Sequence, residues 1–240
     1  MSQTTLRLDP HVHSEASYDA RDPPELLLEQ AADIGLDGVV VTDHDRISAS
    51  LRAAELAPEY GLVGIPGVEV STAHGHLLAI GVEERPRPGE SLADTVERVR
   101  ELGGAAVVPH PFQRTRHGAR GKHIVPAEPD GMETYNAWLF TGYRNRRARA
   151  FARRHGYTAL AGSDAHTVAT LGRAYTELTV PGPREDVTAD AIVEAIREGA
   201  TGVNGRRVPY HKSAGHYVKG AGRKGFWAAR SAGTAALSLF

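Results

Sequence analysis

Two histidines separated by a single residue are the first side chains in this chain that could do chemistry together. His11 and His13 belong to the stretch Leu-Arg-Leu-Asp-Pro-His-Val-His-Ser at residues 6–14, whose alternating pattern is typical of a short strand. Side chains at i and i+2 of a strand point to the same side, so both imidazoles can reach one metal ion. A His-x-His pair is common by chance, and its meaning depends on what the rest of the chain places near it.

Acidic residues and histidines follow the ends of several later apolar runs. These are Asp43 and His44 after residues 38–42, Glu69 after residues 62–66, His110 after residues 105–109, and Asp164 and His166 after residues 157–161. In a β/α barrel the carboxyl ends of all strands open on one face, so these side chains would converge although they span most of the chain. Asp19 adds a carboxylate shortly after the first histidine pair.

Imidazoles and carboxylates that converge in this way suit two or three divalent ions. Such ions lower the pKa of a bound water and stabilise the oxygens of an in-line displacement at phosphorus, so phosphoester hydrolysis is the reaction that fits best. The chain has twelve histidines and no cysteine, which favours Zn, Mn or Fe over soft-metal sites. It has neither a Gly-rich phosphate loop nor a serine nucleophile elbow, so a metal-activated water is the expected nucleophile.

Helices and strands alternate along the chain between these residues. We expect helices over residues 22–35, 47–60, 91–102, 142–155 and 188–198, and strands over residues 6–14, 38–42, 62–66, 76–82, 105–109, 131–135, 157–161 and 175–180. This alternation predicts an α/β fold with mostly parallel strands. Residues 112–130 show little apolar periodicity, and we expect them to form a long basic loop.

Length and composition set limits on organisation and location. A chain of 240 residues can bury one large core, so we expect one domain over residues 1–200 and a Gly-, Arg- and Lys-rich tail over residues 201–240 with no assigned role. The 28 Lys and Arg against 29 Asp and Glu give a net charge of -1, so no global field recruits nucleic acid or an anionic membrane. The absence of signal-peptide features, of an apolar run of roughly 20 residues and of cysteine predicts a cytoplasmic location.

Five motifs in order resemble the PHP (polymerase and histidinol phosphatase) family of metal-dependent phosphoesterases. The matching stretches are Asp-Pro-His-Val-His-Ser at 9–14, Thr-Asp-His at 42–44, Gly-Val-Glu at 67–69, Pro-His-Pro at 109–111 and Ser-Asp-Ala-His at 163–166. The resemblance covers residues 6–180 and implies a distorted (β/α)7 TIM-like barrel with a trinuclear metal site.

The resemblance also implies how the ligands are shared. His11, His13, Glu69 and Asp164 would hold one ion, and Glu69 would bridge to a second ion that His110 also binds. A third ion would take Asp19 or a neighbour, together with His44 and His166. Asp43 would orient a ligand histidine rather than bind metal. The family often supplies one more histidine after the strand at 131–135, where this chain has Asn136 with Glu133 just before it.

Catalysis is expected from the ligand set itself and substrate binding from the basic loop. The expected catalytic residues are His11, His13, Glu69, Asp164 and His166, with a nearby histidine or a metal-bound water protonating the leaving oxygen. The loop could reach over the metals and bind phosphate oxygens through Arg114, Arg116, His117 and Arg120. The substrate would be a small phosphomonoester, a nucleotide or the end of a short oligonucleotide.

Several alternatives remain open at this level. An amidohydrolase-like metal hydrolase also begins with His-x-His on a barrel strand, but no lysine lies at an expected strand end to bridge its metals. A non-catalytic, metal-stabilised module that binds nucleic acid or a partner through its arginines is the other alternative. The six arginines of the helix at 142–155 surround much of its circumference, which favours a solvated outer helix over an RNA-binding face. His76 either faces the site or is an ordinary strand histidine.

Overall fold

The computed structural model describes residues 2–139 and 142–207, and these form a mixed α/β fold with two five-stranded sheets. The first sheet has the order β10-β9-β1-β2-β3, with bounds Thr201–Gly205, Ala174–Pro181, Gln3–Val12, Gly38–Val41 and Val63–Gly64. The second sheet has the order β4-β5-β6-β7-β8, with bounds Gly67–Thr72, Gly75–Ile80, Ala105–Val108, Gly131–Asn136 and Thr158–Gly162.

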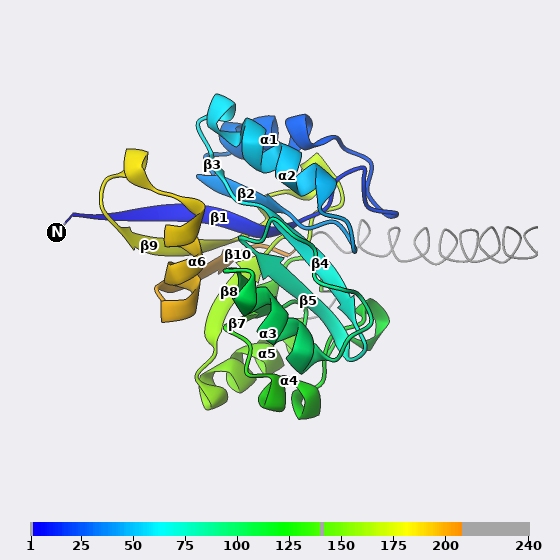
Figure 1. Cartoon of the computed structure of the whole chain (residues 1–240). Helices are drawn as coiled ribbons and strands as arrows, with labels where there is room; N and C mark the ends of the chain where they lie inside the picture. Colours follow the sequence, from blue (N-terminus) through cyan, green and yellow to red (C-terminus); the bar gives the residue numbers. More distant parts are fainter. Residues whose placement is uncertain (1, 140–141, 208–240) are drawn as a thin grey trace, which may run out of the picture.

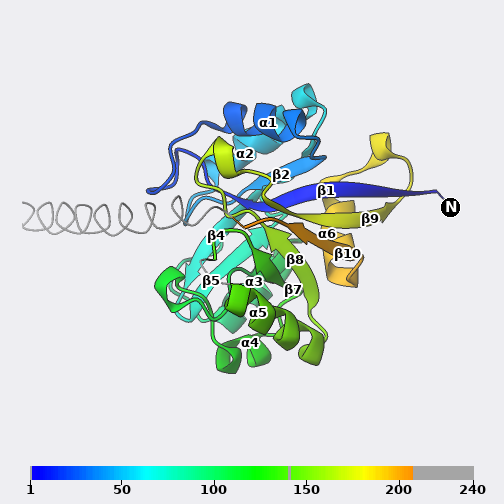
Figure 2. The same ribbon diagram turned by 180° about the vertical axis from the view of Figure 1, so that it is seen from behind.

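Six α-helices in the described residues cover the outsides of these sheets. Their bounds are α1 Pro24–Asp33, α2 Ser48–Leu56, α3 Leu92–Glu101, α4 Gly121–Ala127, α5 Gly142–His155 and α6 Ala189–Glu198. Helices α1 and α2 lie on the side of β2 and β3, whereas α3, α4 and α5 lie on the opposite side, against the second sheet (Figures 1 and 2). The sheets are therefore sandwiched between two groups of helices.

The apolar residues that hold these layers together are buried on both faces of the central strands. All four residues of β2 and all four of β6 are buried, as expected for strands covered on both sides. One cluster joins β1 of the first sheet, through Leu6 and Leu8, to β5 of the second, through Leu78 and Ile80, and continues into α6. Side chains from both sheets thus share one core, which fixes the sheets relative to each other.

The α/β class is confirmed, but a closed seven-fold barrel is not. The described strands form two separate sheets, and β4 pairs with β5, β5 with β6, and β1 with β9 in antiparallel fashion. The turn between β4 and β5 accounts for the first of these antiparallel pairs, because Thr72 pairs with Gly75 and leaves only two residues for the connection. Such a short turn can join antiparallel strands only, because a parallel pair needs a long crossover.

The two sheets nevertheless meet at the ends that carry the candidate ligands. The backbone N–H of His13 donates to the carbonyl of Ala165 at 2.8 Å, and that of Asp45 donates to the carbonyl of Glu69 at 3.0 Å. Isolated bridges link Val12 to Ala165 and His44 to Glu69. The expected convergence of the candidate ligands is therefore present where the two sheets meet.

Two segments differ from their expected structure. Residues 112–130 contain a 3-10 turn at Arg114–Arg116 and the short helix α4, although we expected a loop, because Ile124 and Ala127 are buried against the core despite Pro126 within the helix. Strand β10 includes residue 201, so ordered structure continues past the expected end of the domain at residue 200. The rest of the proposed tail, residues 208–240, is outside the described residues, and the domain boundary stays a prediction. No helix in the described ranges is long and apolar enough to cross a membrane.

Candidate metal centre

Four side chains from three strand ends converge on one point inside the protein. The Nε2 atoms of His11 and His13 are 3.2 Å apart. Glu69 Oε2 lies 3.6 Å from the Nε2 atom of His11 and 3.5 Å from that of His13. Asp164 Oδ1 lies at the same distances from these two nitrogens. We call these four residues the inner group, and all four are fully buried. Ligands about 2.1 Å from one ion in tetrahedral geometry are about 3.4 Å apart, so the spacing suits a divalent ion.

The hydrogen bonds around the two histidines leave lone pairs facing each other. His11 Nδ1 lies 2.8 Å from Glu133 Oε1, so we assign its proton to Nδ1. Ser17 donates its hydroxyl hydrogen to Asp19, which makes its oxygen the acceptor for His13 Nδ1. In neutral rings both Nε2 atoms, 3.2 Å apart, are then acceptors. A cation is needed between them: in metal-free protein a proton can fill this role, because burial alone would lower the pKa of His11 but Asp164, Glu133 and Glu69 raise it, and a divalent ion would replace that proton.

Glu69 connects the inner group to three further histidines. Its Oε1 lies 2.8 Å from His76 Nδ1 and 3.0 Å from His110 Nε2. Its Oε2 lies 2.9 Å from His44 Nδ1, and neither of these two atoms forms a hydrogen bond of good geometry in the described part of the chain. A carboxylate with histidine nitrogens at both oxygens has the arrangement of a bridging metal ligand.

A second set of side chains lies nearer the solvent, and we call Asp19, His44 and His166 the outer group. Asp19 Oδ2 lies 3.1 Å from His166 Nε2 and 3.5 Å from His44 Nε2. His166 donates from Nδ1 to the carbonyl of Asp164 at 2.8 Å, so its Nε2 also presents a lone pair toward a carboxylate. Asp19 and the three histidines 13, 44 and 166 have ligand atoms close enough to surround one ion.

The charges of the cluster call for cations. Burial alone would lower the pKa of His44, but the carboxylates of Glu69 and Asp19 raise it to about 10. Burial also opposes the charge on Asp164 and Glu69, yet the cations and histidines around them hold both pKa values well below the ordinary range. In contrast, burial and the neighbouring His166 lower the pKa of His13 to about 3 and keep it neutral. Neutral imidazole beside ionised carboxylates is the form that binds metals.

Glu133 and Asn136 hold several of the ligands in place. Glu133 accepts from His11 through Oε1, and its Oε2 accepts the backbone N–H of His110 at 2.7 Å. The amide nitrogen of Asn136 donates to Glu133 Oε2 at 2.8 Å and to Asp164 Oδ2 at 3.0 Å. At the place of the family's additional histidine, this chain thus has an amide that ties two carboxylates together.

The backbone is also unusual at two candidate ligands. His110 has φ 29° and Asp164 has φ 53°, a region that non-glycine residues seldom adopt. Strained backbone of this kind tends to persist at functional sites, where the surrounding contacts maintain it. Here the bond from the His110 amide to Glu133 is one such contact.

The eight predicted metal ligands all fall within the clusters that could surround an ion. His76, which the sequence left open, joins them beside Glu69 and His44. Asp43 behaves differently from the expectation that it orients a histidine: it accepts from the backbone and hydroxyl of Ser14 instead. The roles of these residues in binding metal stay predictions at this point.

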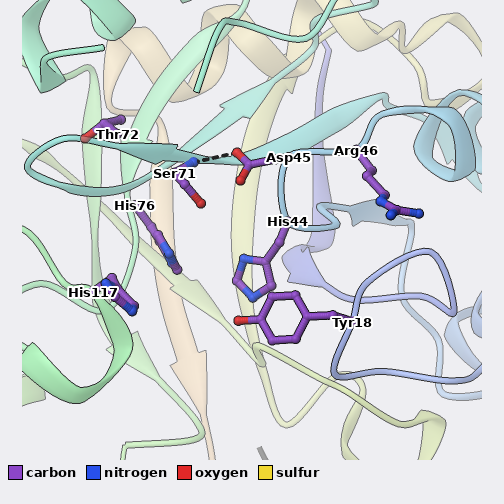
Figure 3. Close-up of a pocket in the computed structure, with 8 residues that line it drawn as sticks. All are labelled: Tyr18, His44, Asp45, Arg46, Ser71, Thr72, His76 and His117. Carbon is purple, nitrogen blue, oxygen red and sulfur yellow. Dashed lines mark hydrogen bonds between the residues drawn. The ribbon is translucent and has the colours of Figure 1, made fainter. Parts of the chain in front are cut away.

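The four residues predicted to bind substrate separate into two places. Arg116 reaches the cluster and pairs with Asp164, with Nη1 2.8 Å from Oδ2. His117 lines a cleft of about 470 Å³ at the mouth of the cluster, together with Tyr18, His44 and His76 (Figure 3). Arg114 and Arg120 do not line this cleft, but they line an adjoining pocket that also includes His117.

The pattern of the whole chain decides its family. Residues 9–163 match the model of the PHP domain, and residues 142–201 match that of the PHP-associated region. The chain belongs to the PHP domain family. This membership makes it a metal-dependent hydrolase, in agreement with the clustered histidines and carboxylates.

Individual relatives of this PHP domain vary in how much they share with it. An uncharacterised protein of Methanocaldococcus jannaschii is 29% identical over 150 residues, which is 58% of this chain and 87% of the relative. A phosphoribosyl 1,2-cyclic phosphate 1,2-diphosphodiesterase of Eggerthella lenta is 37% identical over 97 residues, 38% of this chain and 37% of that protein. Among solved structures, the fold resembles that of a two-domain protein of Bacteroides vulgatus that contains a predicted PHP-like metal-dependent phosphoesterase. The TM-score is 0.72 at 21% sequence identity, and the match covers 85% of this chain and 66% of the Bacteroides chain. This last likeness concerns the fold alone.

Proposed function

We propose that this PHP domain hydrolyses a phosphate ester of a small phosphorylated molecule, a nucleotide or a short oligonucleotide end at a site for two or three divalent ions. The observation that carries the proposal is the inner group, whose two imidazole nitrogens are 3.2 Å apart and each lie 3.5 to 3.6 Å from one oxygen of Glu69 and one oxygen of Asp164. The diphosphodiesterase of Eggerthella lenta supports a phosphorylated substrate through its partial similarity.

The ligand sets follow from the clusters. The inner group would hold one ion, Glu69 and His110 would hold a second, and Asp19, His44 and His166 with His13 would hold a third, while His76 forms a further group with Glu69 and His44. Mn, Zn and Fe are the ions expected from a donor set of nitrogen and carboxylate oxygen. When bound, the ions would supply Lewis-acid activation of water and charge neutralisation at phosphorus.

The chain's own residues have separable tasks in this reaction. Glu133 fixes the proton of His11 on Nδ1 so that Nε2 stays available. Arg116, whose side chain is largely buried, contacts both oxygens of Asp164 through its two terminal nitrogens and so brings a guanidinium to the edge of the inner group, where its charge can attract phosphoryl oxygens. His166 donates from Nδ1 to the Asp164 carbonyl, which keeps its Nε2 available for an ion at the outer group. The cleft volume lies within the range of small-molecule sites.

The first experiment combines metal content with turnover. We expect protein purified without chelator to carry two to three Mn, Zn or Fe ions per chain by plasma mass spectrometry, and to release p-nitrophenolate from p-nitrophenyl phosphate or its diester. Glu69→Gln should lose ions and turnover while keeping the circular dichroism of the parent protein. Fewer than one ion per chain after incubation with each metal, together with no turnover, would reject the proposal and leave a non-catalytic binding module. A cytoplasmic location stays a prediction.

A further inference from the structure

A second pocket of about 310 Å³ adjoins the cleft at the metal cluster. Thr72 and His117 line both the pocket and the cleft, so these two residues lie between them. The remaining lining residues of the second pocket are Ala73, His74, Gly75, Arg114, Gly118, Arg120 and His123. None of the described lining residues is acidic.

The cationic groups of this pocket are not engaged elsewhere. Neither Arg114 nor Arg120 forms an ion pair with a carboxylate of the described residues, whereas Arg98 and Arg100 on α3 each pair with an acidic neighbour. Because the whole chain has a net charge of -1, this excess of positive charge is local. The burial of His123 and the nearby charges of His74, Lys122 and Arg120 lower the pKa of His123, as expected where positive charge accumulates.

The histidines add hydrogen-bond donors to this charge. His74 and His123 stack with ring centroids 4.0 Å apart. The backbone N–H of Leu92 donates to His74 Nδ1, so the proton of the neutral ring is on Nε2. His74 can therefore donate a hydrogen bond without being charged.

The loop that carries the two arginines is held in place before any ligand binds. Its His117 carbonyl accepts the backbone N–H of His76 at 2.9 Å, and the Phe112 N–H donates to the Ala119 carbonyl at 3.0 Å. The loop packs so closely that a Cβ on Gly75 would lie 2.7 Å from the Ala119 nitrogen. Ligand binding would therefore cost little conformational entropy, because the backbone of this loop is already ordered.

His117 also connects the second pocket to the metal cluster. Its ring stacks on that of His76 with centroids 5.3 Å apart, and His76 contacts Glu69 at 2.8 Å. Figure 3 shows these two rings side by side at the edge of the cleft. A substrate whose reacting phosphate is at the cluster can therefore extend past His117 into the second pocket.

We propose that the second pocket binds a further phosphate group of the substrate, so that the preferred substrate carries two phosphates separated by a spacer. This rests on the proposed function for the reacting phosphate and adds the substrate class. Arg114 and Arg120 supply the charge, His74 and His123 supply donors, and His117 lies between the two phosphates. Arginine and backbone-fixed donors are the groups that recognise phosphate in proteins.

The test uses alkyl phosphates that contain no other recognition group. Binding of n-butyl phosphate and of 1,3-propanediol, 1,4-butanediol and 1,6-hexanediol bisphosphates is measured by calorimetry, and their inhibition of p-nitrophenyl phosphate hydrolysis is measured in parallel. We expect at least one bisphosphate to bind ten-fold or more tightly than butyl phosphate. The double variant Arg114→Ala/Arg120→Ala should abolish this preference, so that the bisphosphates bind no more tightly than butyl phosphate does to the same variant. The matched control Arg146→Ala/Arg149→Ala, which removes the same charge from exposed positions of α5, should keep the preference.

The outcomes separate this inference from the proposed function. Equal affinity for all bisphosphates and butyl phosphate would overturn the second phosphate site even if hydrolysis is robust. A preference that both double variants reduce equally would overturn it too, because a general field would then be the cause. If no phosphoester is hydrolysed but the calorimetric preference depends on Arg114 and Arg120, the second site stands and the proposed reaction fails.

Discussion

The inner and outer groups use the same residue types but differ in how firmly the protein holds them. His11, His13, Glu69 and Asp164 are fully buried and are braced by Glu133, Asn136 and Ser17. In the outer group, the side chains of Asp19 and His44 keep 8% and 9% of their surface exposed at the mouth of the cleft. The difference predicts a tightly held inner ion and a more exchangeable outer ion, which is the arrangement that a hydrolase needs to admit substrate on one side only.

The strongest test of this comparison is to change Glu69, the inner residue that also contacts His44 of the outer group. Glu69→Gln should lower the rate by more than the 10- to 100-fold typical of a residue outside the ligand shell, because its two oxygens contact five histidines across the cluster. Ion content should fall at both groups. The exposed Glu83→Gln provides the control. If Glu69→Gln lost only one ion and kept most of the rate, the two groups would be independent sites.

A smaller effect is expected from the outer group alone. Asp19→Asn should remove one ion per chain and leave the inner ion bound, with a loss of rate between that of Glu69→Gln and that of a bracing residue. The reason is that Asp19 contacts His44 and His166, and no inner carboxylate depends on it. Equilibrium dialysis with metal analysis measures the stoichiometry, and exposed Asp33→Asn is the control. Loss of all ions in Asp19→Asn would refute the division into two groups.

The bracing of the inner group can be tested without changing a ligand. Glu133→Gln should weaken metal binding by about 10- to 100-fold, because His11 loses the carboxylate that fixes its Nδ1 proton. Nitrogen NMR of the imidazole in metal-free protein should show a changed tautomer population at His11. Glu133→Asp should recover part of the affinity. An unchanged His11 spectrum with weakened binding would mean that Glu133 acts only through the His110 backbone.

Sequence reasoning could predict that the candidate ligands lie close together, because strand ends in an α/β fold lie on one edge. It was less successful at His76, whose place depends on register. In the β4–β5 hairpin, Glu69 pairs with Leu78, so His76, two residues earlier, shares its face. The two-residue turn at Ala73 and His74 fixes this register, and it is the signal that could have found the contact.

Other features could not be obtained from local pattern at all. The expected parallel arrangement was not met throughout, because several strand pairs are antiparallel, and such pairing depends on partners distant in sequence, such as β1 and β9. The bridge from Asn136 to Glu133 and Asp164 joins residues whose proximity exists only after β7 and β8 pair. Helix α4 contains a proline and has no clear periodicity, and its burial against the core decides its structure.

The smallest effect expected is on the pH dependence of stability in metal-free protein, and it again separates the groups. In the outer group the pKa of His44 is raised to about 10 because Glu69 and Asp19 outweigh its burial. Its proton therefore stabilises the fold below the unfolded pKa of about 6.5, and this stabilisation is lost as the pH rises toward 10. In the inner group the pKa of His13 is lowered to about 3 by burial and His166, so stability falls as the pH drops below about 6.5.

Thermal unfolding of metal-free protein measures both effects. The melting temperature should be highest between these two pH ranges and should decline by several degrees on each side. His44→Gln should mainly reduce the alkaline decline, and the raised pKa of His11 accounts for the remainder. The acid decline should change less, because the His44 charge is a smaller contribution than burial and His166 to the lowered pKa of His13. Bound metal should reduce the alkaline decline as well by replacing the protons. An alkaline decline that is equally steep in His44→Gln would show that the outer group has no excess of negative charge, and the comparison with the inner group would then rest on burial alone.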